Sequence, residues 1–144
     1  TEASKAAFIA EHLSEAAFAR YLADPARDVV VADDAGQLIG YAMVVHGEPA
    51  DPDVAQAVRS RPTAELSKLY VHPRHHGGGV ASALVVAVVD SASRHDAASV
   101  WLGVNQHNAR ANRFYAKSGF ETVGSKRFLV GDTYEDDWVR ERPL

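Results

Sequence analysis

Three consecutive glycines, Gly77, Gly78 and Gly79, stand between apolar runs at residues 66–71 and 81–89. The first run has the length of a strand and the second that of a helix, so the glycines form a strand-to-helix turn. Glycine lets a phosphate approach main-chain nitrogens without a Cβ in the way, and helix N-termini attract anions. The layout predicts a turn that holds the pyrophosphate of a nucleotide-like cofactor. The glycines alone fit a flexible connecting loop equally well.

Two common nucleotide-binding turns do not fit this stretch. No Lys-Ser or Lys-Thr pair follows the glycines, which excludes a P-loop, and their spacing differs from the G-x-G-x-x-G fingerprint of dinucleotide-binding folds. His72, His75 and His76 lie beside the glycines. Neighbouring histidines in one loop rarely point at one ion, and no carboxylate follows at ligand spacing, so we expect no metal site.

The elements around the turn alternate between helix and strand. Apolar residues recur at helical spacing over residues 1–23. The other expected elements are, in order, strands at 27–32 and 38–45, a loop at 48–62 with a short helix at 54–59, a strand at 64–71, a helix that ends near residue 94, a strand at 99–104, a helix at 108–118, and strands at 120–123 and 134–141 that meet at a turn formed by Gly131 and Asp132. This order predicts a mixed α/β sheet covered by helices. Strand alternation predicts that Glu65, Ser67, Leu69 and Val71 share one face.

Composition narrows the class of protein. A chain of 144 residues is most simply one domain, and its net charge of −4 does not favour nucleic-acid binding, which needs a basic surface. The chain has no cysteine, which excludes disulfides, cysteine metal sites and thiolate nucleophiles. No apolar run has membrane-spanning length and no signal peptide opens the chain, so we expect a cytoplasmic enzyme that binds neither membranes nor nucleic acids.

A second motif lies about 30 residues beyond the glycines, after one further strand. It reads Asn108-x-x-Ala111-x-x-Phe114-Tyr115-x-x-x-Gly119-Phe120. The two other stretches that accompany it are Leu69-Tyr70-Val71-His72-Pro73 and His76-Gly77-Gly78-Gly79-Val80-Ala81. Over residues 28–142 the chain thereby resembles the GNAT superfamily, the acetyl-coenzyme A-dependent N-acetyltransferases. The family usually has Gln or Arg where this chain has His76. We expect one GNAT domain over residues 1–144, with the family's first strand missing at its N-terminus.

The resemblance implies a twisted mixed sheet with helices on both faces and a V-shaped gap between two central strands, here at residues 69–71 and 100–104. Acetyl-coenzyme A lies in that gap in the family. Its pantetheine arm would pair with the main chain of Leu69 and Val71, and the Val71 N–H would polarise the thioester carbonyl. The residues that the resemblance implies for cofactor binding are Leu69, Tyr70, Val71, His76, Gly77, Gly78, Gly79, Val80, Ala81, Ser82, Asn108, Ala111, Phe114 and Tyr115.

The resemblance also implies two residues that transfer protons. Tyr115 matches the acid position, where a phenol protonates the leaving thiolate; a packed core aromatic is the alternative. Glu65 is the candidate base on the strand that enters the site, and a surface carboxylate is its alternative. His46, His72 and Asp137 are the other candidates for the base. Because the chain has no cysteine to carry an acyl group, we expect direct attack by a neutral amine in a ternary complex.

The end of the chain has a narrower resemblance. The turn FLVGD, the acidic pair Asp136-Asp137 and the final ERPL are similar to a branch that includes spermine/spermidine-type acetyltransferases. The branch implies a small amine, such as a polyamine, as the acceptor. Two alternatives stay open: an enzyme that acetylates N-terminal or lysine amines of peptides or proteins, and a non-catalytic coenzyme A-binding regulatory domain. Members of the family often dimerise, so a homodimer is also expected.

Overall fold

A computed structural model describes residue 3 and residues 15–144 of the chain. Most of the helix predicted at residues 1–23 therefore lies outside the described residues, and its end is α2. The helices are α2 (Glu15–Ala23), α3 (Pro52–Ala57), α4 (Val80–Arg94) and α5 (Ala109–Lys117). The strands are β1 (Arg27–Asp34), β2 (Gln37–His46), β3 (Thr63–Val71), β4 (Ser99–Asn105), β5 (Glu121–Val130) and β6 (Thr133–Pro143). None of the described helices has the length and apolar character needed to cross a membrane.

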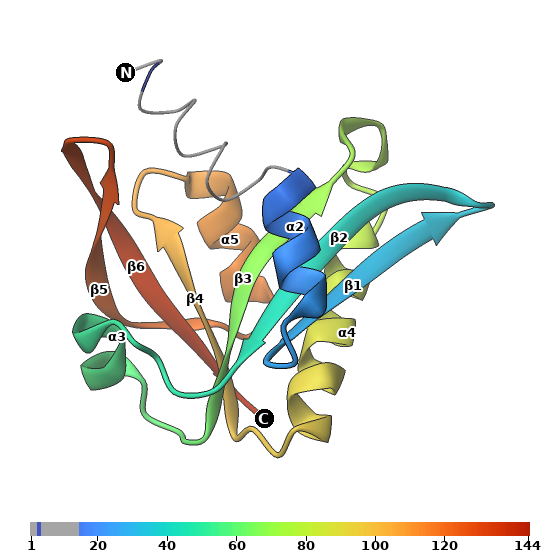
Figure 1. Cartoon of the computed structure of the whole chain (residues 1–144). Helices are drawn as coiled ribbons and strands as arrows, with labels where there is room; N and C mark the ends of the chain where they lie inside the picture. The colour runs from blue at the N-terminus through green and yellow to red at the C-terminus, as the bar shows by residue number, and fades with distance from the viewer. Residues whose placement is uncertain (1–2, 4–14) are drawn as a thin grey trace.

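The described strands form one mixed sheet in the order β1-β2-β3-β4-β6-β5 (Figure 1). Only β3 and β4 pair in parallel, and the other neighbours are antiparallel. This arrangement confirms the predicted mixed α/β sheet. It also places β3 and β4, the strands on either side of the glycine turn and α4, next to each other at the centre of the sheet.

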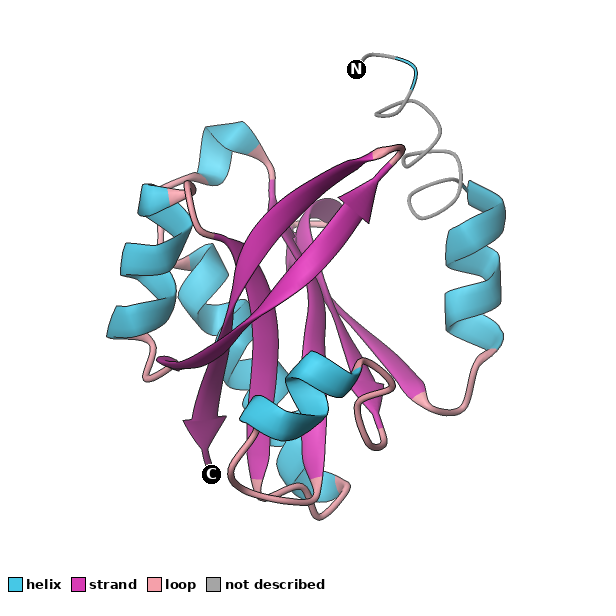
Figure 2. Ribbon diagram, turned by 90° about the vertical axis from the view of Figure 1, so that its left-hand side faces the viewer, coloured by secondary structure: helices cyan, strands magenta, loops and turns pink. Residues whose placement is uncertain are grey.

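Helices cover both faces of the sheet (Figure 2). On one face, Leu84, Val85 and Val88 of α4 pack in the main core with apolar side chains from β2, β3 and β4, and α5 contributes Phe114 and Tyr115 to its margin. On the other face, α3 packs on β4 and β6 in a smaller core of Val54, Val58, Trp101 and Val139. Phe18 of α2 meets Tyr41 of β2 edge to face, with ring centroids 5.3 Å apart. Each sheet face therefore has a buried apolar layer of its own.

The two central strands separate soon after they start. The ladder between β3 and β4 joins Thr63 to Ser99, Ala64 to Val100 and Glu65 to Trp101, and ends there. Beyond this point the strands diverge, as Figure 1 shows. The opening coincides with a β-bulge: Val44 pairs with Leu66 while Met43 pairs with Lys68, so Ser67 is an extra residue on β3. The predicted V-shaped gap is confirmed.

The same bulge makes one prediction wrong. Residues paired across an antiparallel ladder lie on the same face, and Glu65 pairs with Val45 whereas Leu69 pairs with Ala42. Ala42 belongs to the core beneath α4, so Leu69 and Val71 face α4 and Glu65 faces the opposite side with α2. Simple alternation placed Glu65 and Leu69 together because it does not allow for an inserted residue.

The bounds of β5, β6 and α3 also differ from the prediction. The β5–β6 hairpin extends over residues 121–143, although its arms were predicted only at 120–123 and 134–141. Gly124 and Lys126 in the middle of β5 are weak strand formers, and pairing with β6 overrides that preference. The short helix α3 starts at Pro52, two residues early, because the Asp51 carboxylate accepts a hydrogen bond from the Asp53 N–H at 2.9 Å and caps it.

Candidate active site

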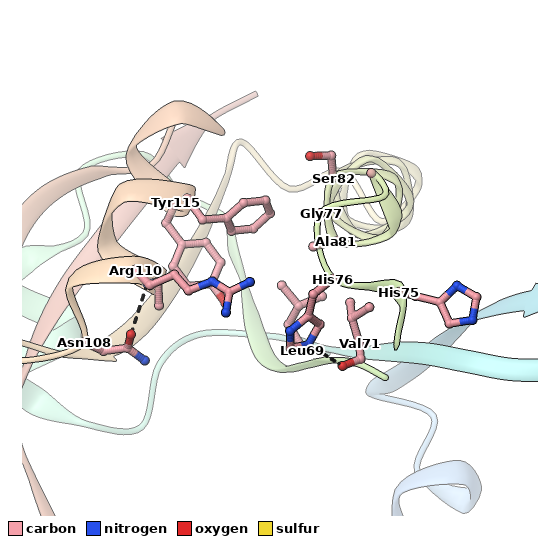
Figure 3. Close-up of a pocket in the computed structure, with 13 residues that line it drawn as sticks. Leu69, Val71, His75, His76, Gly77, Ala81, Ser82, Asn108, Arg110 and Tyr115 are labelled. Carbon is pink, nitrogen blue, oxygen red and sulfur yellow. Dashed lines mark hydrogen bonds between the residues drawn. The ribbon is translucent and has the colours of Figure 1, made fainter. Parts of the chain in front are cut away.

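A groove of about 590 Å³ lies between the end of β3, the glycine turn and α5 (Figure 3). Its lining residues are Leu69, Val71, His75, His76, Gly77, Gly79, Ala81, Ser82, Asn108, Arg110, Ala111, Phe114 and Tyr115. The structure therefore brings together two motifs that are about 30 residues apart in the sequence. Of the predicted cofactor residues, Tyr70, Gly78 and Val80 are not part of this lining.

The edge of β3 offers main-chain groups to the groove. The N–H of His72 donates to the carbonyl oxygen of Ile39 on β2 at 2.7 Å. Because successive main-chain groups of a strand alternate between its two edges, those of Leu69 and Val71 face the β4 side. The β4 ladder ends at Glu65, so among the described residues these groups have no strand partner. An extended ligand can pair with this edge as an added strand would.

The glycine turn leaves the start of α4 uncapped. Gly77 and Gly79 have φ angles of +80° and +86°, a region that favours glycine, and a Cβ on either would meet no atom within 4 Å. Gly79 precedes α4 and supplies no side-chain acceptor to its first turn. The N–H groups of Val80, Ala81 and Ser82 are thus the unsatisfied donors of a helix N-terminus. Their direction and the helix dipole suit a phosphate group.

His76 stands where the family usually has Gln or Arg, and its side chain has a structural contact within the turn. Its Nε2 lies 2.9 Å from the carbonyl oxygen of Val71 (Figure 3). A carbonyl only accepts, so Nε2 carries the hydrogen and donates it. The ring therefore fastens the turn to the end of β3, and the donors that remain for an anion are main-chain N–H groups.

The start of α5 supplies the opposite wall of the groove. Asn108 caps this helix, because its Oδ1 accepts from the Ala111 N–H at 3.1 Å. The side-chain oxygen of Asn108 is therefore already used within the protein. Arg110 extends its guanidinium into the groove (Figure 3), and sequence reasoning missed it. The available signal was a cation in the first turn of a helix, where the dipole disfavours positive charge unless an anion binds nearby.

Tyr115 lies on the same wall, packed against Phe114 and Phe120 with ring centroids 5.3 Å and 5.9 Å away. Burial raises the pKa of its phenol above the usual value of 10.0. The hydroxyl therefore stays protonated at neutral pH. A protonated phenol that lines the groove can donate a proton to a thiolate or another basic group there.

Glu65 lines a different cavity, on the opposite face of the sheet. This second cavity has a volume of about 300 Å³ and is lined by Arg20, Tyr21, Arg27, Met43, Glu65, Ser67 and Lys68. Burial raises the pKa of Glu65, and the charges of Lys126, Arg27 and Lys68 partly oppose that rise. A raised pKa makes the carboxylate a stronger base. The two cavities approach each other at the bulge, where Ser67 lines one and Leu69 lines the other.

The other candidates for the base lie at different places in the structure. Asp137 is buried on the same face as Glu65, and burial raises its pKa while Lys126 opposes the rise. His72 caps the short turn before the glycines, where its Nδ1 accepts from the Arg74 N–H at 3.2 Å. His46 lies on the α4 face beside His95, which caps the C-terminus of α4. A helix of 15 residues is about 22 Å long, so His46 lies far from the groove at the N-terminus of α4.

Two features characterise this protein: a mixed sheet whose two central strands diverge, and a groove with an uncapped helix N-terminus and an open strand edge. A family model described as "Acetyltransferase (GNAT) family" matches residues 2–120. An uncharacterized N-acetyltransferase of Mycobacterium tuberculosis is 44% identical over 139 residues, which are 96% of this chain and 81% of that protein. The chain therefore belongs to the GNAT family of acetyltransferases.

Solved structures share the fold. The PaiA N-acetyltransferase of Thermoplasma acidophilum, crystallised in complex with coenzyme A, has a TM-score of 0.73 at 19% identity, over 100% of this chain and 80% of that chain. A nourseothricin acetyltransferase has a TM-score of 0.67 at 26% identity, over 83% of this chain and 66% of that chain. This chain thus spans just under two thirds of the nourseothricin enzyme.

Proposed function

We propose that the protein is an acetyl-coenzyme A-dependent N-acetyltransferase that acetylates a primary amine of a small molecule. The observation that carries the proposal is the groove, which is lined both by an uncapped helix N-terminus and by a strand edge that has no strand partner among the described residues. The first suits a pyrophosphate, and the second suits an amide-containing arm. Membership of the GNAT family and the coenzyme A complex of the Thermoplasma protein support this reading.

The glycine turn and the start of α4 have room and hydrogen-bond donors for coenzyme A. Gly77 and Gly79 open a space in which a Cβ would meet no protein atom, next to unsatisfied N–H groups. These N–H groups would bind the pyrophosphate, with Arg110 supplying a nearby positive charge. The main chain of Leu69 and Val71 would pair with the pantetheine amides. Bound acetyl-coenzyme A supplies the acetyl thioester, and the N–H of Val71 would orient and polarise its carbonyl.

Tyr115 and Glu65 would transfer the protons. An amine must lose a proton to become nucleophilic, and Glu65 is a half-buried carboxylate on the face from which an acceptor could approach the gap. Tyr115 would give a proton to the leaving thiolate from the cofactor side. The two residues lie on opposite faces of the sheet, so a ternary complex would place the reaction between them.

The acceptor is the least constrained part of the proposal. The cavity beside Glu65 is small, and the nourseothricin enzyme is named for a small-molecule acceptor; both favour a small amine over a protein. A polyamine remains a prediction. Asp137 and Glu135 give the acceptor face negative charge, whereas Arg27 and Lys68 surround Glu65 with positive charge. An amine that also carries an anionic group is therefore a second candidate class.

A panel assay tests the proposal. The chain is incubated with acetyl-coenzyme A and polyamines, aminoglycosides, amino acids or short peptides, and both free thiol and acceptor mass are measured. We expect thiol release that depends on a small amine, with a gain of one acetyl group in that amine. Acetylation of peptides alone would favour the peptide-modifying alternative. Tight binding of coenzyme A without turnover of any amine would favour the regulatory domain.

A further inference from the structure

A second cluster of side chains lies at the end of α4 that is remote from the groove. Asp28 of β1, His46 of β2 and His95 after α4 each present one potential ligand atom, and all three atoms lie within 4.8 Å of one another. None of the three belongs to the proposed acetyl-transfer machinery. They come from three elements that the main core packs together.

Hydrogen bonds orient the side chains of this cluster, which offer nitrogen and oxygen atoms as possible ligands. The Nε2 of His46 lies 3.0 Å from Oδ2 of Asp28, a carboxylate that also accepts from the Ser91 hydroxyl at 2.7 Å. The Nδ1 of His95 lies 2.9 Å from the carbonyl oxygen of Ser91. Because a carbonyl only accepts, Nδ1 carries the hydrogen and Nε2 keeps a free lone pair in the neutral ring. Histidines that bind metals are usually oriented in this way, with the other nitrogen bonded to a carbonyl.

His46 has a nitrogen that the fold does not use. Its side chain is 12% exposed, and its Nδ1 is buried with no hydrogen-bond partner among the described residues. A buried polar atom without a partner destabilises a fold, so an apolar residue would suit this position better if packing were its only role. His46 therefore keeps one unpaired nitrogen, while its other nitrogen, Nε2, faces the Asp28 carboxylate of the cluster.

The electrostatic setting also favours a cation. The cluster lies at the C-terminus of α4, where the helix dipole is negative, and the Asp28 carboxylate adds a full negative charge. Hydrogen bonds from Ser91 and His46 lower the pKa of Asp28, which stays ionised. Two imidazoles and one carboxylate form a set that suits Zn²⁺ and neighbouring divalent transition metals, and it leaves a position for water.

We propose that Asp28, His46 and His95 bind one divalent transition-metal ion of the zinc type. The ion would tie the β1–β2 hairpin to the end of α4 and so stabilise the main core from its edge. The His46 and His95 rings now stack 3.7 Å apart at an interplanar angle of 15°. Ligands of a tetrahedral zinc ion lie roughly 3.4 Å apart and point at it in the ring plane, so binding requires the His95 ring to leave this stack. His95 is exposed and at a helix end, and its ring has to turn out of the stack while its Nδ1 stays within reach of the Ser91 carbonyl.

Metal titration of the full chain tests the proposal. Zn²⁺ binding is measured by calorimetry, and Co²⁺ binding by the visible absorption of a four-coordinate ion. We expect one equivalent to bind and to raise Tm. We expect binding to weaken at least about tenfold in His95→Gln and in Asp28→Asn. His107→Gln removes an exposed histidine outside the cluster and should bind as the parent does.

Two outcomes would overturn the proposal. One is the absence of saturable Zn²⁺ binding by the parent chain, and the other is equal binding by the parent, His95→Gln and Asp28→Asn. Far-ultraviolet circular dichroism shows whether each variant is folded, and the exposed position of His95 makes His95→Gln the safer of the two. Metal-free His95→Gln should acetylate amines at the parent rate, because the cluster does not touch the groove.

Discussion

Tyr115 lies in the wall of the groove. Burial raises the pKa of its phenol, so the hydroxyl stays protonated at neutral pH. Tyr115→Phe removes only that hydroxyl and retains the ring that packs on Phe114 and Phe120. We expect turnover to fall by about ten- to hundredfold, roughly 1.4–2.7 kcal/mol of transition-state stabilisation, with little change in coenzyme A affinity. Steady-state kinetics and coenzyme A titration measure the two quantities. Unchanged turnover would remove Tyr115 from the acid role.

Glu65 predicts a particular pH dependence. A base must be ionised to accept a proton, and burial raises the pKa of Glu65 above its usual value of 4.5. The rate should therefore fall on the acid side through a pKa higher than that of an ordinary glutamate. Glu65→Gln should be slow and should lack this acid limb in a plot of kcat/KM against pH. If the limb persists in Glu65→Gln, the base is another residue, with Asp137 the first to test because it is buried on the same face.

Residue types and their spacing in the sequence were enough to predict most residues of the groove. They were not enough to predict on which face of the sheet Glu65 lies or where His46 lies. The paired motifs identified Leu69, Val71, Gly77, Gly79 and Tyr115, which line one cavity in the structure. The face of Glu65 depended on one extra residue, Ser67, which no periodicity shows. The place of His46 depended on contacts with β1 and α4, which are distant in sequence.

At the scale of elements, Gly78 and Gly79 of the glycine turn differ in backbone conformation, and substitution of each should have a different effect. Gly79 has φ +86° and precedes α4, whereas Gly78 has no left-handed φ and a Cβ there would meet only His75 O, at an ordinary 3.5 Å. Gly79→Ala should cost about 1–2 kcal/mol of folding free energy and weaken coenzyme A binding, because the start of α4 must shift. Gly78→Ala should leave both nearly unchanged. Denaturant unfolding and coenzyme A titration compare the pair, and equal effects would show that the turn does not depend on its left-handed glycine.

The order of helices and strands could be predicted because each has a recognisable local sequence pattern. Apolar periodicity and glycines were sufficient for the core helix and strands. The length of β5 could not be predicted, because weak strand formers such as Gly124 and Lys126 interrupt it and the β6 ladder holds them in the strand. The V-shaped gap was expected only from the family resemblance. In the structure it arises where the bulge coincides with the end of the β3–β4 ladder.

At the scale of the whole molecule, the sheet separates the two halves of the proposed reaction. The groove with the glycine turn lies on the side of α4 and α5, and the cavity with Glu65 lies on the side of α2. The gap between β3 and β4 opens beyond the pair Glu65–Trp101, between these two sides. A ternary complex is therefore consistent with the architecture, because each substrate has a separate approach to one opening.

This division places a half-buried carboxylate, Glu65, beside the gap, and its partial burial affects the stability of the fold. Glu65 has a raised pKa in the folded state, chiefly because burial penalises its charge. Such a group contributes stability below its unfolded pKa and loses that contribution as the pH rises through the folded pKa. At neutral pH the ionised side chain therefore destabilises the fold. Attraction by Lys126, Arg27 and Lys68 offsets only part of this cost.

Glu65→Gln should consequently be slower than the parent yet more stable at neutral pH, as expected where a functional group is retained at the expense of stability. The advantage should vanish below about pH 4, where Glu65 is neutral in the folded and unfolded chain alike. Thermal unfolding at both pH values measures the difference in Tm. Glu121→Gln, at an exposed position on β5, controls for the loss of one negative charge and should show little difference. A lower Tm for Glu65→Gln at neutral pH would mean that the surrounding cations stabilise the carboxylate by more than burial costs.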